Sequence, residues 1–118
     1  MDLGHGMGRP TMHAAALHPR IAGSMGTEFS PYLYRQSMLA LSECTMDVEC
    51  FTMEHPRVFF LDSNIKSFKS LNPFTHVYAF QIGMPEDVID AMLNLITESR
   101  SVKYVKMHTS MQRAVCPC

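Results

Sequence analysis

The chain has 118 residues, of which 47% are hydrophobic and 18% are charged, and its formal net charge is −1. This length accommodates one domain, and this composition is typical of a globular protein and excludes a disordered one. Because 10 basic residues are balanced by 11 acidic ones, the overall charge excludes a general attraction to nucleic acid or to a membrane surface.

The chain begins with an acid followed by glycines at every second position, Asp2-Leu3-Gly4-His5-Gly6-Met7-Gly8. Glycine lets a backbone turn tightly and approach a ligand that a Cβ atom would push away. The pattern of 10–17 then predicts a helix, whose first turn offers unpaired N–H groups and a partial positive charge. We therefore expect this stretch to form the floor of a nucleoside-cofactor site.

The rest of the chain alternates between strand and helix patterns. Short apolar runs predict strands, two of them buried on both faces, and apolar residues at helical spacing predict helices. In chain order we expect a strand over 21–27 ending in Glu28, a helix over 31–43 capped by Ser30, a buried strand over 58–61, one or two helical turns over 65–71, a buried strand over 76–80, a helix from Pro85 to Ile96 and a more exposed strand over 102–107.

This alternation implies an α/β fold with a mostly parallel, Rossmann-like sheet and flanking helices. In such sheets ligands bind beyond the carboxyl ends of the strands, near the point where the strand order switches. Four features follow four different strands and would meet at that edge, namely the glycine turn, Glu28, Asp62 and Gln81.

The acids at this edge fit a nucleoside. Glu28, after the second predicted strand, can accept hydrogen bonds from both ribose hydroxyls. Asp62, after the third, can accept a bond from an adenine amino group, with Phe60 or Phe59 as an apolar wall. Alternatives remain open at each position: an ordinary glycine-rich turn, a solvated surface acid at Glu28, and an N-cap for the helix over 64–70 at Asp62.

Other ligand classes are not indicated. The 4 cysteines form no CxxC pair and the 6 histidines are scattered, so we expect neither a metal site nor a thiol nucleophile. No apolar run approaches the ~20 residues that span a bilayer, and no signal peptide is visible. We expect one intracellular domain over 1–118, with 111–118 as a flexible tail.

The glycine motif over residues 2–8 resembles the first motif of class I S-adenosylmethionine-dependent methyltransferases, and Gly26-Thr27-Glu28 resembles their second-strand acidic motif. With Pro73-Phe74-Thr75-His76-Val77-Tyr78, the chain is most similar to histone-lysine methyltransferases of the disruptor-of-telomeric-silencing (DOT) type. These are Rossmann-like enzymes without a SET domain that methylate a lysine on the nucleosome core. The resemblance implies a nuclear chromatin regulator.

The resemblance also implies residue roles. Asp2, Gly4 and Gly6 would hold the amino-acid end of S-adenosylmethionine. Glu28 would bind the ribose, and Asp62 with Phe60 would bind the adenine.

Catalysis would depend on positioning. Gln81 stands beside the position of the family's polar residue at the end of the fourth strand, often asparagine, and would orient the lysine amine. The implied substrate is a nucleosome or histone, with indirect contact to DNA and no membrane partner. No metal is implied.

The sequence departs from the family by lacking an apolar strand and a covering segment before Asp2. That strand is central in the family's sheet, and each buried backbone group left unpaired costs ~1–3 kcal/mol. We expect a truncated domain with a near-complete cofactor edge on a weakened sheet. Alternatives are an inactive remnant that serves as a binding module, and a class I methyltransferase acting on RNA or a small molecule. A nicotinamide-dependent oxidoreductase is disfavoured, because the glycine spacing is not GxGxxG.

Overall fold

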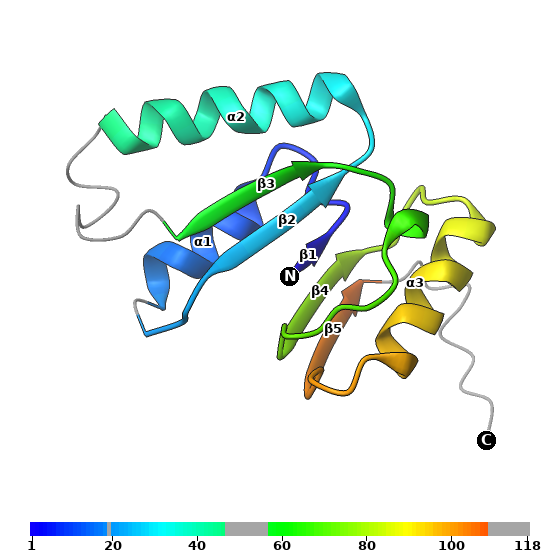
Figure 1. The fold of residues 1–118 in the computed structure, drawn as a ribbon. Helices are drawn as coiled ribbons and strands as arrows, with labels where there is room; N and C mark the ends of the chain where they lie inside the picture. The colour runs from blue at the N-terminus through cyan, green and yellow to red at the C-terminus, as the bar shows by residue number, and fades with distance from the viewer. Residues whose placement is uncertain (19, 47–56, 109–118) are drawn as a thin grey trace.

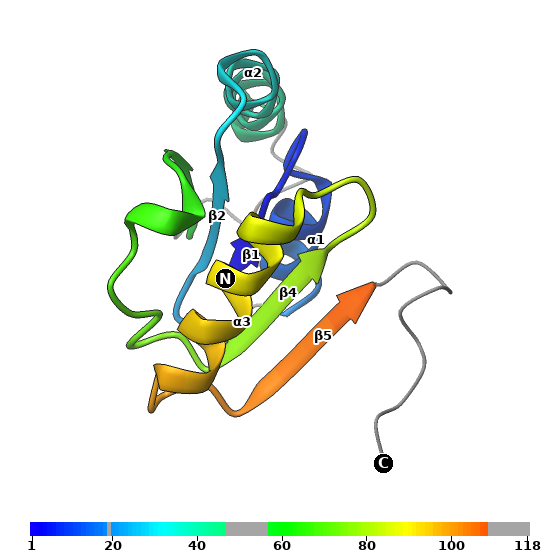
Figure 2. The same cartoon turned by 90° about the vertical axis from the view of Figure 1, so that its right-hand side faces the viewer.

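The computed structural model describes residues 1–18, 20–46 and 57–108. It contains one five-stranded, all-parallel sheet of order β3-β2-β1-β4-β5, flanked by helices (Figures 1 and 2), which confirms the Rossmann-like class. The tail over 111–118 lies outside the described residues. The elements are β1 (Asp2–Leu3), α1 (Arg9–Leu17), β2 (Ser24–Glu28), α2 (Pro31–Met46), β3 (Val58–Asp62), the 3₁₀ helix η1 (Ile65–Ser67), β4 (His76–Phe80), α3 (Glu86–Glu98) and β5 (Tyr104–His108).

The central strand is the short one. β1 has 2 residues, whereas β2 and β4 on either side have 5 each. Asp2 pairs with Gly26 of β2 and with Tyr78 of β4. Met1 extends the pairing of β1 with β4. Its carbonyl accepts a hydrogen bond from the Tyr78 N–H at 2.9 Å, and its ammonium donates one to the His76 carbonyl at 2.9 Å. Beside Met1 lies a cavity of about 930 Å³, lined by the end of α1, the start of β2 and the segment before β4.

The main core lies between the sheet and α3, which Figure 2 shows in front of β1 and β4. Glu86 and Asp87 occupy the first turn of this helix, where acids complement the partial positive charge of the N-terminus. The buried residues of α3 are Ile89, Met92 and Leu95, and they face the sheet and η1, whereas Leu93 is 42% exposed. The core consists of Leu3, Val77, Ala79, Ile65, Leu71, Ile89, Met92 and Leu95.

Two strands predicted to be buried on both faces are exposed on one. Phe59 in β3 is 54% exposed, and Phe80 in β4 is 47% exposed. The reason is that α1 and α2 cover β2 and β3 on one face, whereas α3 covers β4 on the other (Figures 1 and 2). Among residues 1–18, 20–46 and 57–108, each half of the sheet therefore has helices on one face only.

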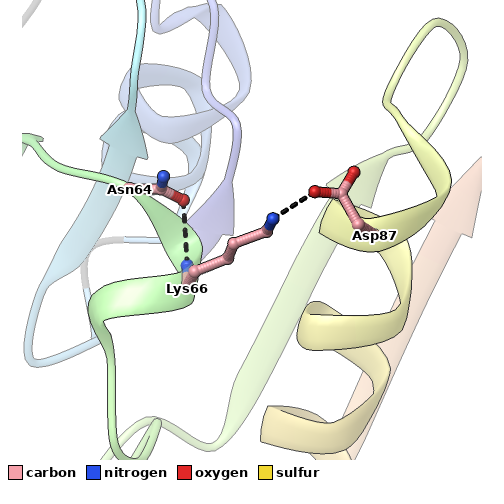
Figure 3. A network of polar contacts seen from close by, with 3 residues as sticks. All are labelled: Asn64, Lys66 and Asp87. Atoms are coloured by element: carbon pink, nitrogen blue, oxygen red, sulfur yellow. Dashed lines mark hydrogen bonds and ion pairs between the residues drawn. The ribbon is translucent and has the colours of Figure 1, made fainter.

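The segment after β3 is fastened to α3. The Asn64 side chain accepts a hydrogen bond from the Lys66 N–H at 3.0 Å, and the Lys66 ammonium bonds the Asp87 carboxylate (Figure 3). This bond lowers the pKa of Asp87. Asn64, and not Asp62, therefore caps η1, which is shorter than the predicted helix over 65–71. No helix in the described ranges is long and apolar enough to cross a membrane.

Candidate functional site

The glycine turn connects β1 to α1 through three left-handed residues. Gly4, Gly6 and Gly8 have φ values of 76°, 58° and 86°, a region that side chains disfavour. The N–H groups of Gly4 and His5 both donate to the Thr27 carbonyl at 2.9 Å. The turn is thereby attached to the carboxyl end of β2.

Glu28 closes this turn. Its Oε2 atom accepts a hydrogen bond from the Gly6 N–H at 2.8 Å, and its Oε1 atom accepts one from the Ser30 N–H at 3.2 Å. An ionised carboxylate offers about four acceptor positions, so capacity remains for hydroxyl donors. Asp62 pairs with Glu28 in the register of β2 and β3, and its side chain is exposed. The structure thus brings the turn, Glu28 and Asp62 to one edge of the sheet.

Asp2 ends near the same edge of the sheet, but its side chain is buried against α1. It is 5% exposed, and its Oδ2 atom accepts a hydrogen bond from the Thr11 hydroxyl at 2.9 Å. Burial raises the pKa of Asp2 to about 6, against the opposing effect of the Thr11 bond. Burial likewise lowers the pKa of the Met1 ammonium, an effect that the Asp2 charge opposes. Asp2 therefore ties β1 to α1 in this structure.

Phe60 supports the turn from below. It is 7% exposed, and a Cβ atom added to Gly8 would lie 2.5 Å from its Cζ atom. Close packing of this ring against the turn leaves little of it for an adenine wall, the role expected from the sequence. The exposed Phe59 points to the opposite face of the sheet, because side chains alternate along a strand.

His5 is buried inside the turn. Its ring centroid lies 4.5 Å from that of Phe60, and its Nδ1 atom is 2.8 Å from the Gly6 carbonyl. Burial lowers the pKa of His5, which favours a neutral ring that donates from Nδ1 to Gly6. The buried Nε2 atom has no hydrogen-bond partner in the described part of the chain.

Gly26 lies inside β2, where there is no room for a side chain. A Cβ atom at this position would lie 2.8 Å from atoms of both His5 and Thr11, which pass directly over the strand. Thr11 was not expected at the site from the sequence. Its role depends on contact between α1, β1 and β2, which also includes a bond from the Ser24 hydroxyl to the Thr11 carbonyl at 2.7 Å, and no local pattern signals it.

Gln81 follows β4 and faces β5. It is 7% exposed, its N–H donates to the His108 carbonyl at 2.9 Å, and its Nε2 atom lies 3.7 Å from the Met107 sulfur. Thioether sulfur is a weak acceptor, so this side chain is held loosely. The same loop covers the glycine turn, because a Cβ atom on Gly4 would lie 2.5 Å from Met84 Cε.

The edge offers features suited to a nucleoside. The position of a Cβ atom on Gly6 has nothing within 4 Å, so a ligand can approach the backbone there. Glu28 supplies acceptors beside it, and α1 begins immediately after the turn. The residues present thus fit the ribose and its neighbourhood better than they fit the adenine ring. Within the described ranges no three His, Cys, Asp or Glu side chains gather as a metal site.

No protein-family model matches this sequence, and no curated protein matches it significantly.

Proposed function

We propose that the chain is a class I methyltransferase domain that binds S-adenosylmethionine at the carboxyl edge of its sheet. The observation that carries this proposal is the 2.8 Å bond between the acid that ends β2 and the glycine turn that follows β1. In open parallel sheets this junction lies at the switch in strand order, where ligands bind. The order β3-β2-β1-β4-β5 places β1 at that switch.

Glu28 is assigned to the ribose. Its carboxylate is already oriented by Gly6 and Ser30, so a vicinal diol would meet acceptors that need no rearrangement. Asp62, exposed on the neighbouring strand end, is assigned to the adenine amino group. Gly4 and Gly6 provide the backbone along which the amino-acid end would lie, with Asp2 supporting them from below through Thr11.

The acceptor assigned by the resemblance is a lysine amine of a nucleosomal histone, which implies a nuclear location. The bound cofactor supplies an electrophilic methyl group. The role of Gln81 is to orient the neutral amine in line with that methyl group, for which its amide would leave the weak Met107 contact. In the transfer, the N–CH3 bond would form as the sulfonium S–CH3 bond breaks, with S-adenosylhomocysteine as the leaving group, and the methylated amine would then lose a proton to solvent.

A second candidate is a binding module without catalysis. It is favoured by the engagement of Gln81 with β5. Such a module would bind cofactor or partner but transfer no methyl group.

Isothermal titration calorimetry with S-adenosylmethionine and S-adenosylhomocysteine tests the cofactor site. We expect the unmodified chain to bind and Glu28→Gln to bind about 10- to 100-fold more weakly, since hydrogen bonds to charged groups are worth ~1.5–3 kcal/mol. Glu43→Gln, an exposed acid on α2, is the matched control. Absence of heat at millimolar ligand would contradict the proposal.

Radiolabelled methyl transfer to nucleosomes, free histones and RNA separates the candidates. Transfer to a histone lysine that is lost in Gln81→Ala supports the enzyme. Cofactor binding with no transfer to any substrate supports the binding module.

A further inference from the structure

In the described part of the chain no helix covers the face of β4 and β5 opposite α3, and this face carries aromatic and basic side chains. Alternate residues of the two paired strands lie on it, and we call this set the aromatic face. Tyr104 is 63% exposed and stacks on His76 with ring centroids 4.7 Å apart. Tyr78 meets His108 edge-on at 5.7 Å. The aromatic face consists of His76, Tyr78, Phe80, Tyr104, Lys106 and His108.

A groove runs between this face and α1. Pro10 and Ala14 on α1 and His18 at its C-cap recur every four residues and line one wall. Tyr78 and Tyr104 line the floor with Lys106. The cavity has a volume of about 420 Å³. Ligand sites of ~300–1,000 Å³ hold small organic molecules, so one nucleotide fits this space.

Among the described residues, the lining of the groove includes a single acid. The sequences of α1, β4 and β5 contain no Asp or Glu, while Arg9 lies on α1 and Lys106 on β5. The acid that reaches the groove is Asp2, which is buried and bonded to Thr11.

The acids of this half of the molecule lie on the other side. On α3 they are Glu86, Asp87, Asp90 and Glu98. On that side the Lys66 ammonium bonds the Asp87 carboxylate, and the sequence of α3 itself contains no Lys or Arg.

We propose that the aromatic face binds unpaired nucleotides of a single-stranded nucleic acid. A base would stack on Tyr104 or Tyr78 at the mouth of the groove, and the neighbouring phosphate would lie near Lys106. Aromatic rings on a sheet combined with cations are the features that bind single strands with little sequence preference, because every base has a flat apolar surface. The groove borders the cofactor edge through Asp2, and the proposal does not rest on the proposed function.

Fluorescence anisotropy of the full chain tests this with labelled oligouridine, oligothymidine and a duplex of the same length at low salt. We expect both single strands or one of them to bind, and the duplex to bind much more weakly. Oligodeoxyuridine, which differs from oligouridine in the 2′-hydroxyl alone, is measured as well. Stronger binding of oligouridine than of oligodeoxyuridine identifies the ribose hydroxyl as a contact, whereas equal binding assigns recognition to base and phosphate. Tyr104→Ala and Lys106→Glu should each weaken binding on the order of tenfold, and Tyr104→Phe should retain it.

Matched controls lie elsewhere on the surface. Tyr32→Ala removes a tyrosine on α2 that is 69% exposed, and Lys69→Glu reverses an exposed lysine outside the face. These variants should bind as the unmodified chain does, and melting curves verify that all variants are folded. The proposal is overturned by absent binding, by equal binding of duplex and single strands, or by equal losses in the controls. Sedimentation showing that the face instead pairs two copies of the chain would overturn it as well.

Discussion

Asp2 combines a central position in the sheet with a buried carboxyl group. Its neighbours across the sheet are Gly26 and Tyr78, and its partner above is the Thr11 hydroxyl. That the acid of the first motif would lie near Glu28 was predictable, because neighbouring parallel strands end at the same edge. The position of the Asp2 side chain beneath α1 was not predictable, since Thr11 and Asp2 meet only when β1, α1 and β2 pack together.

Asp2 makes stability depend on pH. The pKa of Asp2 is raised from 3.8 to about 6 in the folded chain. The folded state therefore holds the proton more tightly, and the stabilisation is complete below pH ~4 and is lost as pH rises through about 6. Asp2→Asn keeps an acceptor for Thr11 without this loss. We expect the variant to gain ~3 kcal/mol relative to the unmodified chain between pH ~4 and ~7.5.

Urea unfolding at several pH values across that interval measures the difference. The Met1 ammonium, whose pKa is lowered by burial, contributes the opposite trend in both proteins, and this trend is larger in Asp2→Asn because the Asp2 charge no longer raises the Met1 pKa. A difference that stays constant with pH would contradict the assignment.

Two glycines of the turn should differ in their tolerance of alanine. Gly8 has a φ of 86° and its added Cβ would lie 2.5 Å from Phe60, whereas the Cβ of Gly6 would meet open space. Gly6→Ala should cost only the backbone strain of ~1–2 kcal/mol. Gly8→Ala adds overpacking of ~1–3 kcal/mol, which Phe60→Leu should partly relieve. Denaturant unfolding checks this, and equal costs at the two glycines would exclude Phe60 as the support of the turn.

At the scale of elements, local patterns predicted what depends on local interactions. The strand over 76–80 and the amphipathic helix after Pro85 have their predicted places, because apolar spacing and first-turn acids are properties of the segment itself. The burial of 58–61 and 76–80 was predicted wrongly. The number of covered faces of a strand depends on the face of the sheet on which each helix packs. An apolar run in the sequence does not indicate that face.

The short β1 leaves strand positions that can be filled by design. Ser24 and His76 start β2 and β4 two residues before the partners of Asp2, so backbone ahead of Met1 would have neighbours on both sides. A short engineered extension of valines and isoleucines before Met1 should occupy the adjoining cavity. We expect a gain of ~1–3 kcal/mol in unfolding free energy from apolar burial and added backbone bonds.

The control for this design is a glycine–serine extension of equal length, which adds chain without apolar surface. Thermal and urea unfolding of the two proteins measure the gain. Equal stabilities would show that the cavity beside Met1 does not accept a strand.

At the scale of the whole molecule, the sequence predicted the class of fold but not the distribution of charge. Strand and helix alternation implies parallel strands with crossovers, and this sheet has that form. A net charge of −1 gave no sign that α3 collects acids while α1, β4 and β5 carry none. That separation arises only when the sheet places α1 and α3 on opposite faces.

The pairing of β1 also sets where the molecule would come apart. Among the described strands, β3–β2 and β4–β5 are each joined along 5 residues, whereas the two pairs meet through Asp2 and Leu3 of β1, with Met1 adding bonds to β4. A local opening of the sheet would occur at β1. It would separate β3–β2 and β4–β5, and each strand pair would keep the helices packed on it. The glycine turn is hydrogen-bonded to Thr27 in the β3–β2 pair and packs against Met84, which follows β4 in the other pair. A molecule bound at the glycine turn would therefore contact both strand pairs and oppose their separation.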